Sequence, residues 1–196
     1  MPQEDAILMQ RIKEGDRAAF KILVEKHQLS VLNLCLRFTG NKTDAEDLAQ
    51  EVFIRIFQAA SRYEAKAAFT TWLYRIAVNL CLNFQRRQKI LDFFSIDSNH
   101  KHAPDHQRKI PDIIDELRPD AEFELKERQQ LVQAAIQSLP ENQRTVVILY
   151  RYHNLSYEEI AETLETTVSA VESRLHRAKL NLKAKLAPLL KEEMSL

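Results

Sequence analysis

The spacing of apolar residues constrains the fold of this 196-residue chain more than any other feature. Apolar side chains recur at helical intervals over 20–38, 45–60 and 70–88, and again from 121 onward. The chain also has only two glycines, Gly15 and Gly40, so the glycine-rich phosphate loops, nucleophile elbows and dinucleotide-binding turns of many enzymes cannot be built. The pattern therefore predicts an all-α fold.

Residues 91–120 interrupt this pattern, because they are polar, lack sustained periodicity and hold three of the six prolines. We interpret the segment as a flexible linker. The sequence then predicts two small helical domains, 1–90 and 121–196, on either side of it. The three prolines are Pro104, Pro111 and Pro119.

Several residues mark the expected helix ends. Gly40 and Asn41 end the first long helix, and Thr43 to Glu46 has the pattern of a capping box with Thr43 as N-cap. Pro140 suits the first turn of a helix, and Asn154 ends it. Ser156 to Glu159 forms a second capping box.

Cysteine use and hydropathy indicate the compartment. Cys35 and Cys81 are far apart in the sequence and each lies within a helical apolar pattern, so we expect buried, reduced thiols. The N-terminus lacks a signal-peptide core, and no apolar run approaches the roughly 20 residues of a membrane span. These features predict a cytoplasmic protein without direct membrane insertion.

A helix-turn-helix pattern lies near the C-terminus. A short helix over 155–164, a turn at 165–167 and a longer helix over 168–186 match that motif, whose second helix enters the DNA major groove. Six Lys and Arg residues stand against Glu172 alone within 171–191. A solvated, lysine-rich helix is the alternative interpretation. The expected buried stripe is Val171, Leu175, Ala178 and Leu182.

A second segment, 69–87, combines aromatic, amide and basic side chains. Aromatic rings stack on bases, amides read base edges and arginines contact phosphates, so this face suits single-stranded DNA. A core role for Trp72 and Tyr74 is the alternative, but two amides at i and i+4 are harder to place in a core. The residues on the shared face are Trp72, Arg75, Asn79, Asn83 and Arg86.

Zero net charge, from 28 basic and 28 acidic residues, excludes a strongly basic, nonspecific coat protein for nucleic acid. The charge is unevenly distributed, however: residues 1–90 hold 14 basic and 10 acidic groups, and 91–120 hold 4 and 7. We expect a protein that binds DNA weakly alone and is placed on it by a larger partner.

In combination, these segments resemble bacterial sigma factors of the extracytoplasmic-function (ECF) type, over roughly 7–88 and 121–190. The residues that carry the resemblance are Asp44–Phe53, Phe69–Asn79, Leu139–Arg144, Leu155–Ala161 and Ser173–Ala178. The resemblance implies a factor that binds core RNA polymerase and directs it to promoters. Its region 2 would recognise and melt the −10 element, and its region 4 would read the −35 element.

The resemblance also implies roles for individual residues. Asn79 and Asn83, together with the loop Tyr63–Thr71, would hold a flipped non-template base. Contacts to the −10 element would come from Tyr63, Phe69, Trp72, Arg75, Asn79, Asn83, Arg86 and Arg87. Contacts to the −35 element would come from Ser169, Glu172, Ser173, Arg174, His176, Arg177 and Lys179. Contacts to the polymerase would come from Asp44, Asp47, Gln50, Glu51 and Arg55.

Promoter DNA, core RNA polymerase and an anti-sigma factor are the implied partners, with no cofactor and no metal. The turn at 165–167 and the helix entry at 168–171 lack the glycine and proline common in the family, and Glu172 stands where a basic residue is usual. An acid there could accept a hydrogen bond from cytosine or repel phosphate. The promoter sequence therefore cannot be transferred from a relative.

Two other functional classes remain as alternatives. A helix-turn-helix regulator acting without core polymerase would explain 139–190 but not the motifs at 44–53 and 69–79. A helical enzyme would need a catalytic or metal site, and His100, His102 and His106 lie in the expected linker without a fixed frame. We expect no enzymatic activity, because the polymerase performs the chemistry.

Overall fold

The structure is a computed structural model that describes residues 2–64, 68–97 and 129–193. Within these ranges every regular element is a helix and none is a strand, so the predicted all-α fold is confirmed. The chain separates into two compact units, unit 1 (1–108) and unit 2 (109–196). The His100, His102 and His106 group lies outside the described residues.

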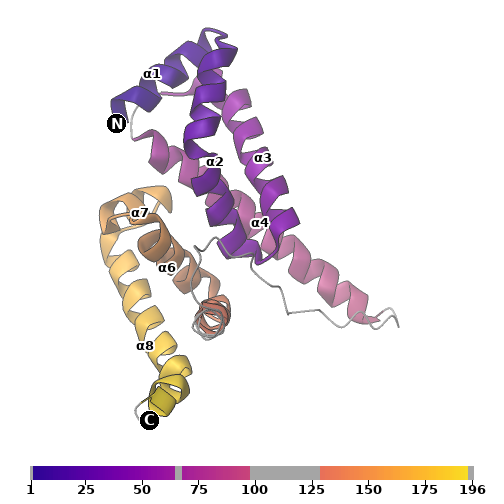
Figure 1. The fold of residues 1–196 in the computed structure, drawn as a ribbon, viewed down its shortest axis with the longest axis vertical. Helices are drawn as coiled ribbons and strands as arrows, with labels where there is room; N and C mark the ends of the chain where they lie inside the picture. The colour runs from indigo at the N-terminus through magenta and orange to yellow at the C-terminus, as the bar shows by residue number, and fades with distance from the viewer. Residues whose placement is uncertain (1, 65–67, 98–128, 194–196) are drawn as a thin grey trace, which may run out of the picture. The chain divides into compact units, whose positions relative to one another are not determined.

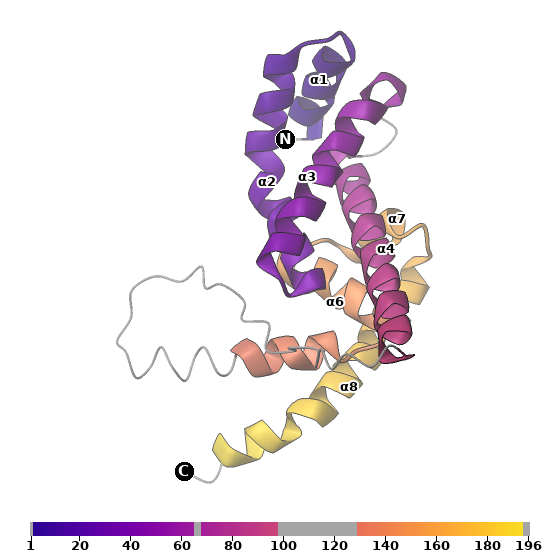
Figure 2. The ribbon, with the colours of Figure 1, turned by 90° about the vertical axis from the view of Figure 1, so that its right-hand side faces the viewer.

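Unit 1 is a helical bundle (Figures 1 and 2). The short link at Gly40 returns the chain, so that α2 and α3 lie side by side, and α4 packs against both. The first helix packs on α2 and also contacts η1 and α4. The described elements are α1 (Pro2–Lys13), α2 (Arg17–Thr39), α3 (Lys42–Ala59), η1 (Ala60–Arg62) and α4 (Phe69–Asp97).

Large apolar side chains from three helices fill the core of unit 1. Each has lost essentially all of its solvent contact, which stabilises the fold by roughly 1.5–3 kcal/mol per side chain before chain entropy is counted. The core therefore fixes how α2, α3 and α4 are rotated about their own axes. The side chains are Leu23, Val31, Leu34 and Phe38 of α2, Val52 and Ile56 of α3, and Phe69 and Leu73 of α4.

The two cysteines lie in this core. Both are buried and free, which confirms the prediction of reduced, buried thiols. Their sulfur atoms are 3.8 Å apart across α2 and α4. The contact with Cys35, together with burial, raises the pKa of the Cys81 thiol well above its ordinary value. Cys81 is therefore a weak nucleophile, as expected of a packing residue.

Local interactions set the ends of α2. The Asp16 side chain accepts hydrogen bonds from the backbone N–H groups of Ala18 and Ala19, at 2.9 and 3.1 Å. The bond from Ala19 and a bond from Arg11 hold the pKa of Asp16 below its ordinary value. At the other end Gly40 adopts a left-handed conformation (φ 67°), and its N–H donates to the Leu36 carbonyl. The predicted helix end at Gly40 is confirmed.

The predicted start of α3 is wrong. The helix begins at Lys42, and its N-cap is Asn41 rather than Thr43. Asn41 is extended, and its side-chain oxygen accepts from the Asp44 N–H at 3.2 Å. Asparagine is at least as good an N-cap as threonine, and its use here gives the helix two more residues. The expected capping box at Thr43 therefore lies inside the first turn.

The predicted end of the next helix is also wrong. We expected a helix from Thr70 to Gln88 and a linker from residue 91, whereas α4 runs from Phe69 to Asp97. Residues 91–97 contain no proline or glycine that would break a helix. Leu91, Phe93 and Phe94 are all exposed, so these apolar residues do not follow the helical pattern that burial of one face produces.

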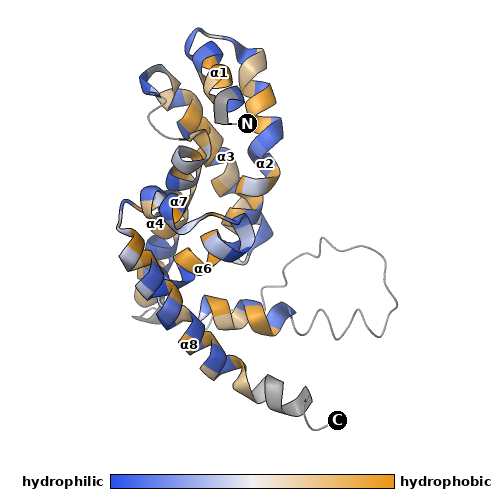
Figure 3. Ribbon diagram, turned by 90° about the vertical axis from the view of Figure 1, so that its left-hand side faces the viewer, coloured by the Kyte–Doolittle hydropathy of each residue, from blue (hydrophilic) through white to orange (hydrophobic). Residues whose placement is uncertain are grey.

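Unit 2 consists of a helix at 129–137 followed by α6 (Glu141–His153), α7 (Tyr157–Thr163) and α8 (Val168–Glu193). Both α6 and α7 pack against α8. Figure 3 shows the alternation of hydrophilic and hydrophobic residues along α8 that results from burying one side of it. The core is formed by Ile136, Leu139, Val146, Ile148, Leu149, Leu155, Ile160, Val171, Leu175 and Ala178.

The helix boundaries of unit 2 agree with those predicted from the sequence, except at three helix ends. Pro140 directly precedes α6 as its N-cap, and Asn154 ends α6 in a left-handed conformation (φ 53°). The second capping box is confirmed, with Ser156 Oγ accepting from the Glu159 N–H at 3.1 Å and the Glu159 carboxylate accepting from the Ser156 N–H at 2.8 Å. In contrast, the short helix is 157–163 rather than 155–164, and α8 continues to Glu193 rather than Leu186.

The turn between α7 and α8 spans 164–167, one residue more than expected. It has the hydrogen bonds of a Schellman motif: Thr166 N–H to the Ala161 carbonyl at 2.9 Å, and Glu165 N–H to the Glu162 carbonyl at 3.4 Å. This motif requires a left-handed residue, and Glu165 adopts φ 51°. Glycine is the usual residue at that position because it has no Cβ to clash.

This turn yields a stability prediction with opposite signs at two neighbouring glutamates. Glu165→Gly should stabilise unit 2 by up to about 1 kcal/mol, because it relieves the left-handed strain. Glu162→Gly should destabilise it by about 1 kcal/mol, because Glu162 lies within α7. Urea unfolding of the full chain by far-UV circular dichroism measures both, and Trp72 fluorescence reports unit 1 separately. Changes of the same sign in the free energy of unfolding of the two variants would contradict backbone strain at Glu165.

Candidate nucleic-acid and polymerase interfaces

Three aromatic rings form a cluster where the chain enters α4. The ring centroid of Tyr63 lies 5.0 Å from that of Trp72 and 6.3 Å from that of Phe69, and Phe69 and Trp72 are 6.0 Å apart. Tyr63 and Trp72 are partly exposed, whereas Phe69 is 1% exposed. The structure thus places Phe69 in the core beneath the cluster, rather than on the DNA-facing surface where we expected it, since an aromatic side chain gains most from full burial.

The Tyr63 hydroxyl is buried and, within the described residues, has no hydrogen-bond partner. Burial raises the pKa of this hydroxyl above its ordinary value, and the Asp5 carboxylate contributes to the shift. The group is therefore a neutral phenol at physiological pH. A buried donor without a partner is costly in a folded protein, so a ligand that accepts from it would gain a strong contact.

The outer face of α4 is polar, as predicted. Asn79 and Asn83 are exposed one turn apart, and Arg86 Nη1 lies 3.4 Å from Asn83 Oδ1. Arg87 is exposed and Arg75 is half-buried. The same helix buries its opposite face, formed by Leu73, Tyr74, Ala77, Val78, Leu80 and Cys81.

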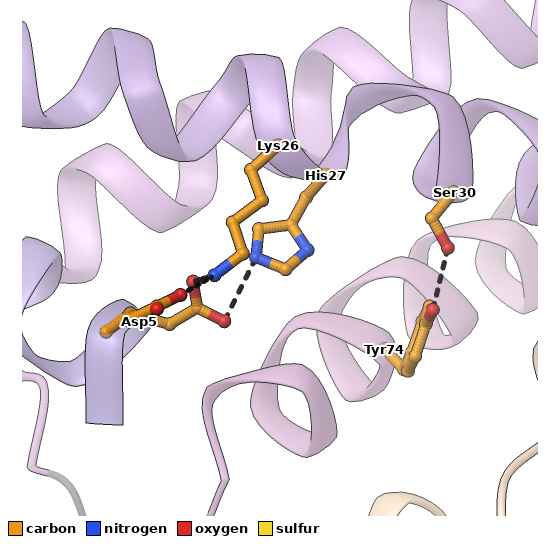
Figure 4. Close-up of polar contacts among 6 residues, drawn as sticks. Asp5, Lys26, His27, Ser30 and Tyr74 are labelled. Carbon is orange, nitrogen blue, oxygen red and sulfur yellow. Dashed lines mark hydrogen bonds and ion pairs between the residues drawn. The ribbon is translucent and has the colours of Figure 1, made fainter. Parts of the chain in front are cut away.

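Tyr74 and Trp72 differ in burial. Tyr74 is 8% exposed and its hydroxyl is 2.7 Å from the Ser30 hydroxyl of α2, as Figure 4 shows. It is a core residue, in line with the alternative interpretation. Trp72 is half-buried in the ring cluster and so keeps part of its surface exposed. The tyrosine therefore anchors α4, and the tryptophan remains accessible to a ligand.

The start of α8 presents a polar surface above its buried stripe. Thr167 begins the helix, its hydroxyl accepting from the Ala170 N–H at 3.2 Å. Val171, Leu175 and Ala178 are buried as predicted, and Leu182 is half-buried. The predicted contact residues share the outer side: Ser169, Glu172, Ser173, His176, Arg177 and Lys179 are exposed, and Arg174 is half-buried.

The predicted polymerase-binding residues of α3 also lie at the surface. Asp47, Gln50 and Arg55 are exposed, and Asp44 and Glu51 are half-buried. Arg55 Nε donates to Glu51 Oε1 at 2.7 Å. An exposed i, i+4 pair of this kind contributes only a few tenths of a kcal/mol to stability, so its charges remain available to a partner.

Sequence reasoning missed an apolar groove beside these residues. The groove lies between α2 and α3, has a volume of about 420 Å³ and includes Gln50 at its edge. Ile54 and Phe57 are 49% and 48% exposed, although the helical pattern placed Phe57 inside, and the Phe57 ring packs 5.0 Å from that of Phe20. The signal was a helix with more apolar positions than one buried face needs. The lining is Phe20, Val24, Gln50, Phe53, Ile54, Phe57 and Gln58.

Searches for two other kinds of site give negative results over the described residues. No group of three or more His, Cys, Asp or Glu side chains in that part of the chain is arranged to hold a metal ion. None of the described helices combines the length and the apolar character needed to span a bilayer.

Both units match known protein families. The Sigma-70 region 2 family matches residues 23–90, and the Sigma-70, region 4 family matches residues 129–182. The RNA polymerase sigma-H factor of Pseudomonas aeruginosa is 36% identical over 194 residues, which cover 97% of each chain. The ECF RNA polymerase sigma-E factor of Haemophilus influenzae is 33% identical, over 95% of this chain and 97% of that one.

Two solved structures are also similar to this chain. CnrH, in complex with the cytosolic domain of CnrY, is 25% identical with a TM-score of 0.68, over 94% of this chain and 98% of that one. The sigma factor RpoE of Bartonella quintana, in complex with the anti-sigma factor NepR, has the same fold, with a TM-score of 0.65 at 20% identity over 86% and 96%.

The region 2 match distinguishes between the remaining functional classes. A regulator with only a helix-turn-helix domain leaves the match at 23–90 unexplained, whereas a sigma factor accounts for both units. The chain belongs to the ECF group of the sigma-70 family, and it binds core RNA polymerase and directs transcription initiation at promoters that it recognises through the −10 and −35 elements.

Proposed function

We propose that the −10 element is held at the start and outer face of α4. Tyr63 and Trp72 of the ring cluster and the amides of Asn79 and Asn83 form the pocket for a flipped non-template base. The observation that carries this assignment is the orphaned Tyr63 hydroxyl next to the partly exposed Trp72, whose ring packs against that of Tyr63. The phenol supplies a hydrogen-bond donor and the indole supplies a stacking surface, which are the two contacts that a flipped base needs.

The rest of the α4 face binds the backbone of the same strand. Arg86 and Arg87 are exposed beyond the amides, where they contact phosphates, and Arg75 lies between the ring cluster and Asn79. Phosphate contacts position the strand, and base contacts in the pocket provide specificity. Phe69 acts indirectly, as the floor of the ring cluster.

The start of α8 reads the −35 element in the major groove. Arg174 and Arg177 are suited to bidentate contacts with guanine, and Lys179 lies further along the helix, where phosphates are nearer. Glu172 is exposed in the same surface, so a cytosine amino group facing it is favoured over a phosphate. Ser169, Ser173 and His176 complete the surface.

Core RNA polymerase binds the α3 face. Asp44, Asp47, Gln50, Glu51 and Arg55 supply the polar contacts, and the adjacent groove accepts apolar side chains. A mixed surface of this kind, with an apolar centre and a charged rim, is typical of protein–protein interfaces. The sigma factor contributes no catalytic group, because the polymerase forms the phosphodiester bond. The site of action is the cytoplasm, where the polymerase works.

The domain assignment is 1–90 for region 2 and 121–196 for region 4, with the linker between them and α4 extending region 2 to residue 97. An anti-sigma factor inhibits the protein by covering its DNA- and polymerase-binding faces. Family membership supports this partner, as do the two similar structures solved as complexes, one of them with a protein named as an anti-sigma factor.

The base pocket predicts a defect confined to promoter opening. The double variant Asn79→Ala, Asn83→Ala should slow open-complex formation about tenfold or more, because each lost hydrogen bond is worth roughly 1 kcal/mol. Permanganate reactivity of unpaired thymines on a cognate promoter, selected by runoff transcription from a promoter library, measures opening. Affinity for core polymerase should stay unchanged, and normal opening would contradict the pocket.

The −35 assignment predicts a sequence-dependent effect of one arginine. Arg177→Ala should weaken binding to the −35 element by roughly 1–3 kcal/mol and relax base preference at one position. Lys185→Ala, on the exposed distal part of α8, is the matched control and should weaken binding equally on all sequences. Holoenzyme binding to duplexes with single substitutions in the −35 element measures both. Equal, sequence-independent losses would reassign Arg177 to phosphate.

The polymerase assignment predicts a charge-reversal effect on α3. Asp47→Arg should weaken binding to core polymerase about tenfold or more, because like charges at an interface cost over 1 kcal/mol. Glu25→Arg reverses the same charge on α2, where Glu25 pairs only with Lys21 across an exposed turn, and should have little effect. Fluorescence anisotropy with labelled sigma factor measures both affinities. A larger loss for Glu25→Arg would place the interface on α2.

A further inference from the structure

A buried carboxylate on α1 is connected to the ring cluster of Tyr63, Phe69 and Trp72. Asp5 is only 3% exposed, although aspartate is rarely buried without a partner. Its two oxygens contact two neighbouring residues of α2 (Figure 4): Oδ1 is 2.7 Å from Lys26 Nζ, and Oδ2 is 3.2 Å from His27 Nε2. The bond from Asp5 raises the pKa of Lys26 above its ordinary value, so the carboxylate has a permanent cationic partner.

His27 connects this carboxylate to the aromatic cluster. The imidazole is 8% exposed, and its ring centroid lies 5.3 Å from that of Phe69 at an angle of 49°. Phe69 in turn packs against both Tyr63 and Trp72. A continuous chain of contacts therefore runs from α1 through α2 to the ring cluster.

A second connection is electrostatic. The Asp5 carboxylate is close enough to Tyr63 to add to the rise of its pKa. The helix α1 also packs on η1, the turn that leads directly into Tyr63, and on α4. Asp5 therefore acts on the ring cluster directly at Tyr63 as well as through Phe69.

We propose that Asp5, acting through His27, is a positioning residue that holds Phe69, Tyr63 and Trp72 in the geometry that accepts the flipped −10 base. This inference rests on the proposed base pocket. The physical reason for a polar rather than an apolar support is position: the Asp5–Lys26 ion pair adds little net stability over apolar packing, but it holds the carboxylate at one place against the imidazole beneath Phe69.

Glu4 provides a matched control for Asp5. It is the adjacent acidic residue and also contacts Lys26, at 3.1 Å, but its side chain is 66% exposed and no contact joins it to His27. Neutralising either carboxylate removes one of the two negatively charged partners of Lys26. Only the change at Asp5 breaks the connection to the rings.

The experiment compares full-length Asp5→Asn with Glu4→Gln in holoenzyme. Asp5→Asn should slow open-complex formation about tenfold and reduce discrimination between −10 elements that differ at the flipped base, with affinity for core polymerase unchanged. Glu4→Gln should stay within twofold of the unaltered protein. Trp72 is the only tryptophan in the chain, so a shift of its emission in Asp5→Asn, absent in Glu4→Gln, directly reports the displaced ring cluster.

His27→Phe keeps a ring against Phe69 while removing the contact with Asp5, and it decides the question if Asp5→Asn does not fold. It should show the same loss of discrimination at the −10 base. Unaltered discrimination and Trp72 emission in His27→Phe, or in a folded Asp5→Asn, would overturn the inference. The Asn79→Ala, Asn83→Ala variant serves as the reference: a defect there with none at Asp5 rejects only the positioning role, whereas normal opening there rejects the pocket itself.

Discussion

The packing of α4 against α2 and α3 is the constraint on which the function of unit 1 depends. A helix can bury only one face, and the burial of Leu73, Ala77 and Cys81 leaves Asn79 and Asn83 on the outside. The Ser30–Tyr74 hydrogen bond ties the same helix to α2. The outer face of α4, which we propose meets the promoter, is thus a direct consequence of the core beneath it.

The same principle operates in unit 2, where the buried stripe of α8 orients its first turns outward. The capping box at Ser156 and the Schellman turn at Glu165 set the ends of α7, and so determine where α8 begins. The neutral total charge fits this arrangement. Basic side chains are concentrated in residues 1–90 and along α8, the parts proposed to contact DNA, and acidic ones elsewhere, which fits the expectation of a protein that binds DNA weakly alone.

The fold class and most helices could be predicted because apolar periodicity and capping residues are local signals. Gly40, Asn154 and the Ser156 capping box were correctly interpreted, since each acts within a few residues of itself. The start of α3 was missed because two good N-caps compete there, and Asn41 prevails. The end of α4 was missed because Leu91, Phe93 and Phe94 are exposed there, so these apolar residues do not mark a buried face.

The candidate site likewise has features that the sequence predicts and features that depend on the tertiary structure. The sequence by itself determined two helical units, their amphipathic faces and the motifs that identify a sigma factor, because these depend on the order and spacing of residues. Only the tertiary structure decided that Phe69 is buried beneath the ring cluster, that Phe57 lines a groove, and that Asp5 lies against His27, whose ring packs on Phe69. Those facts depend on which helices meet, and contacts between residues distant in the chain leave no periodic trace in it.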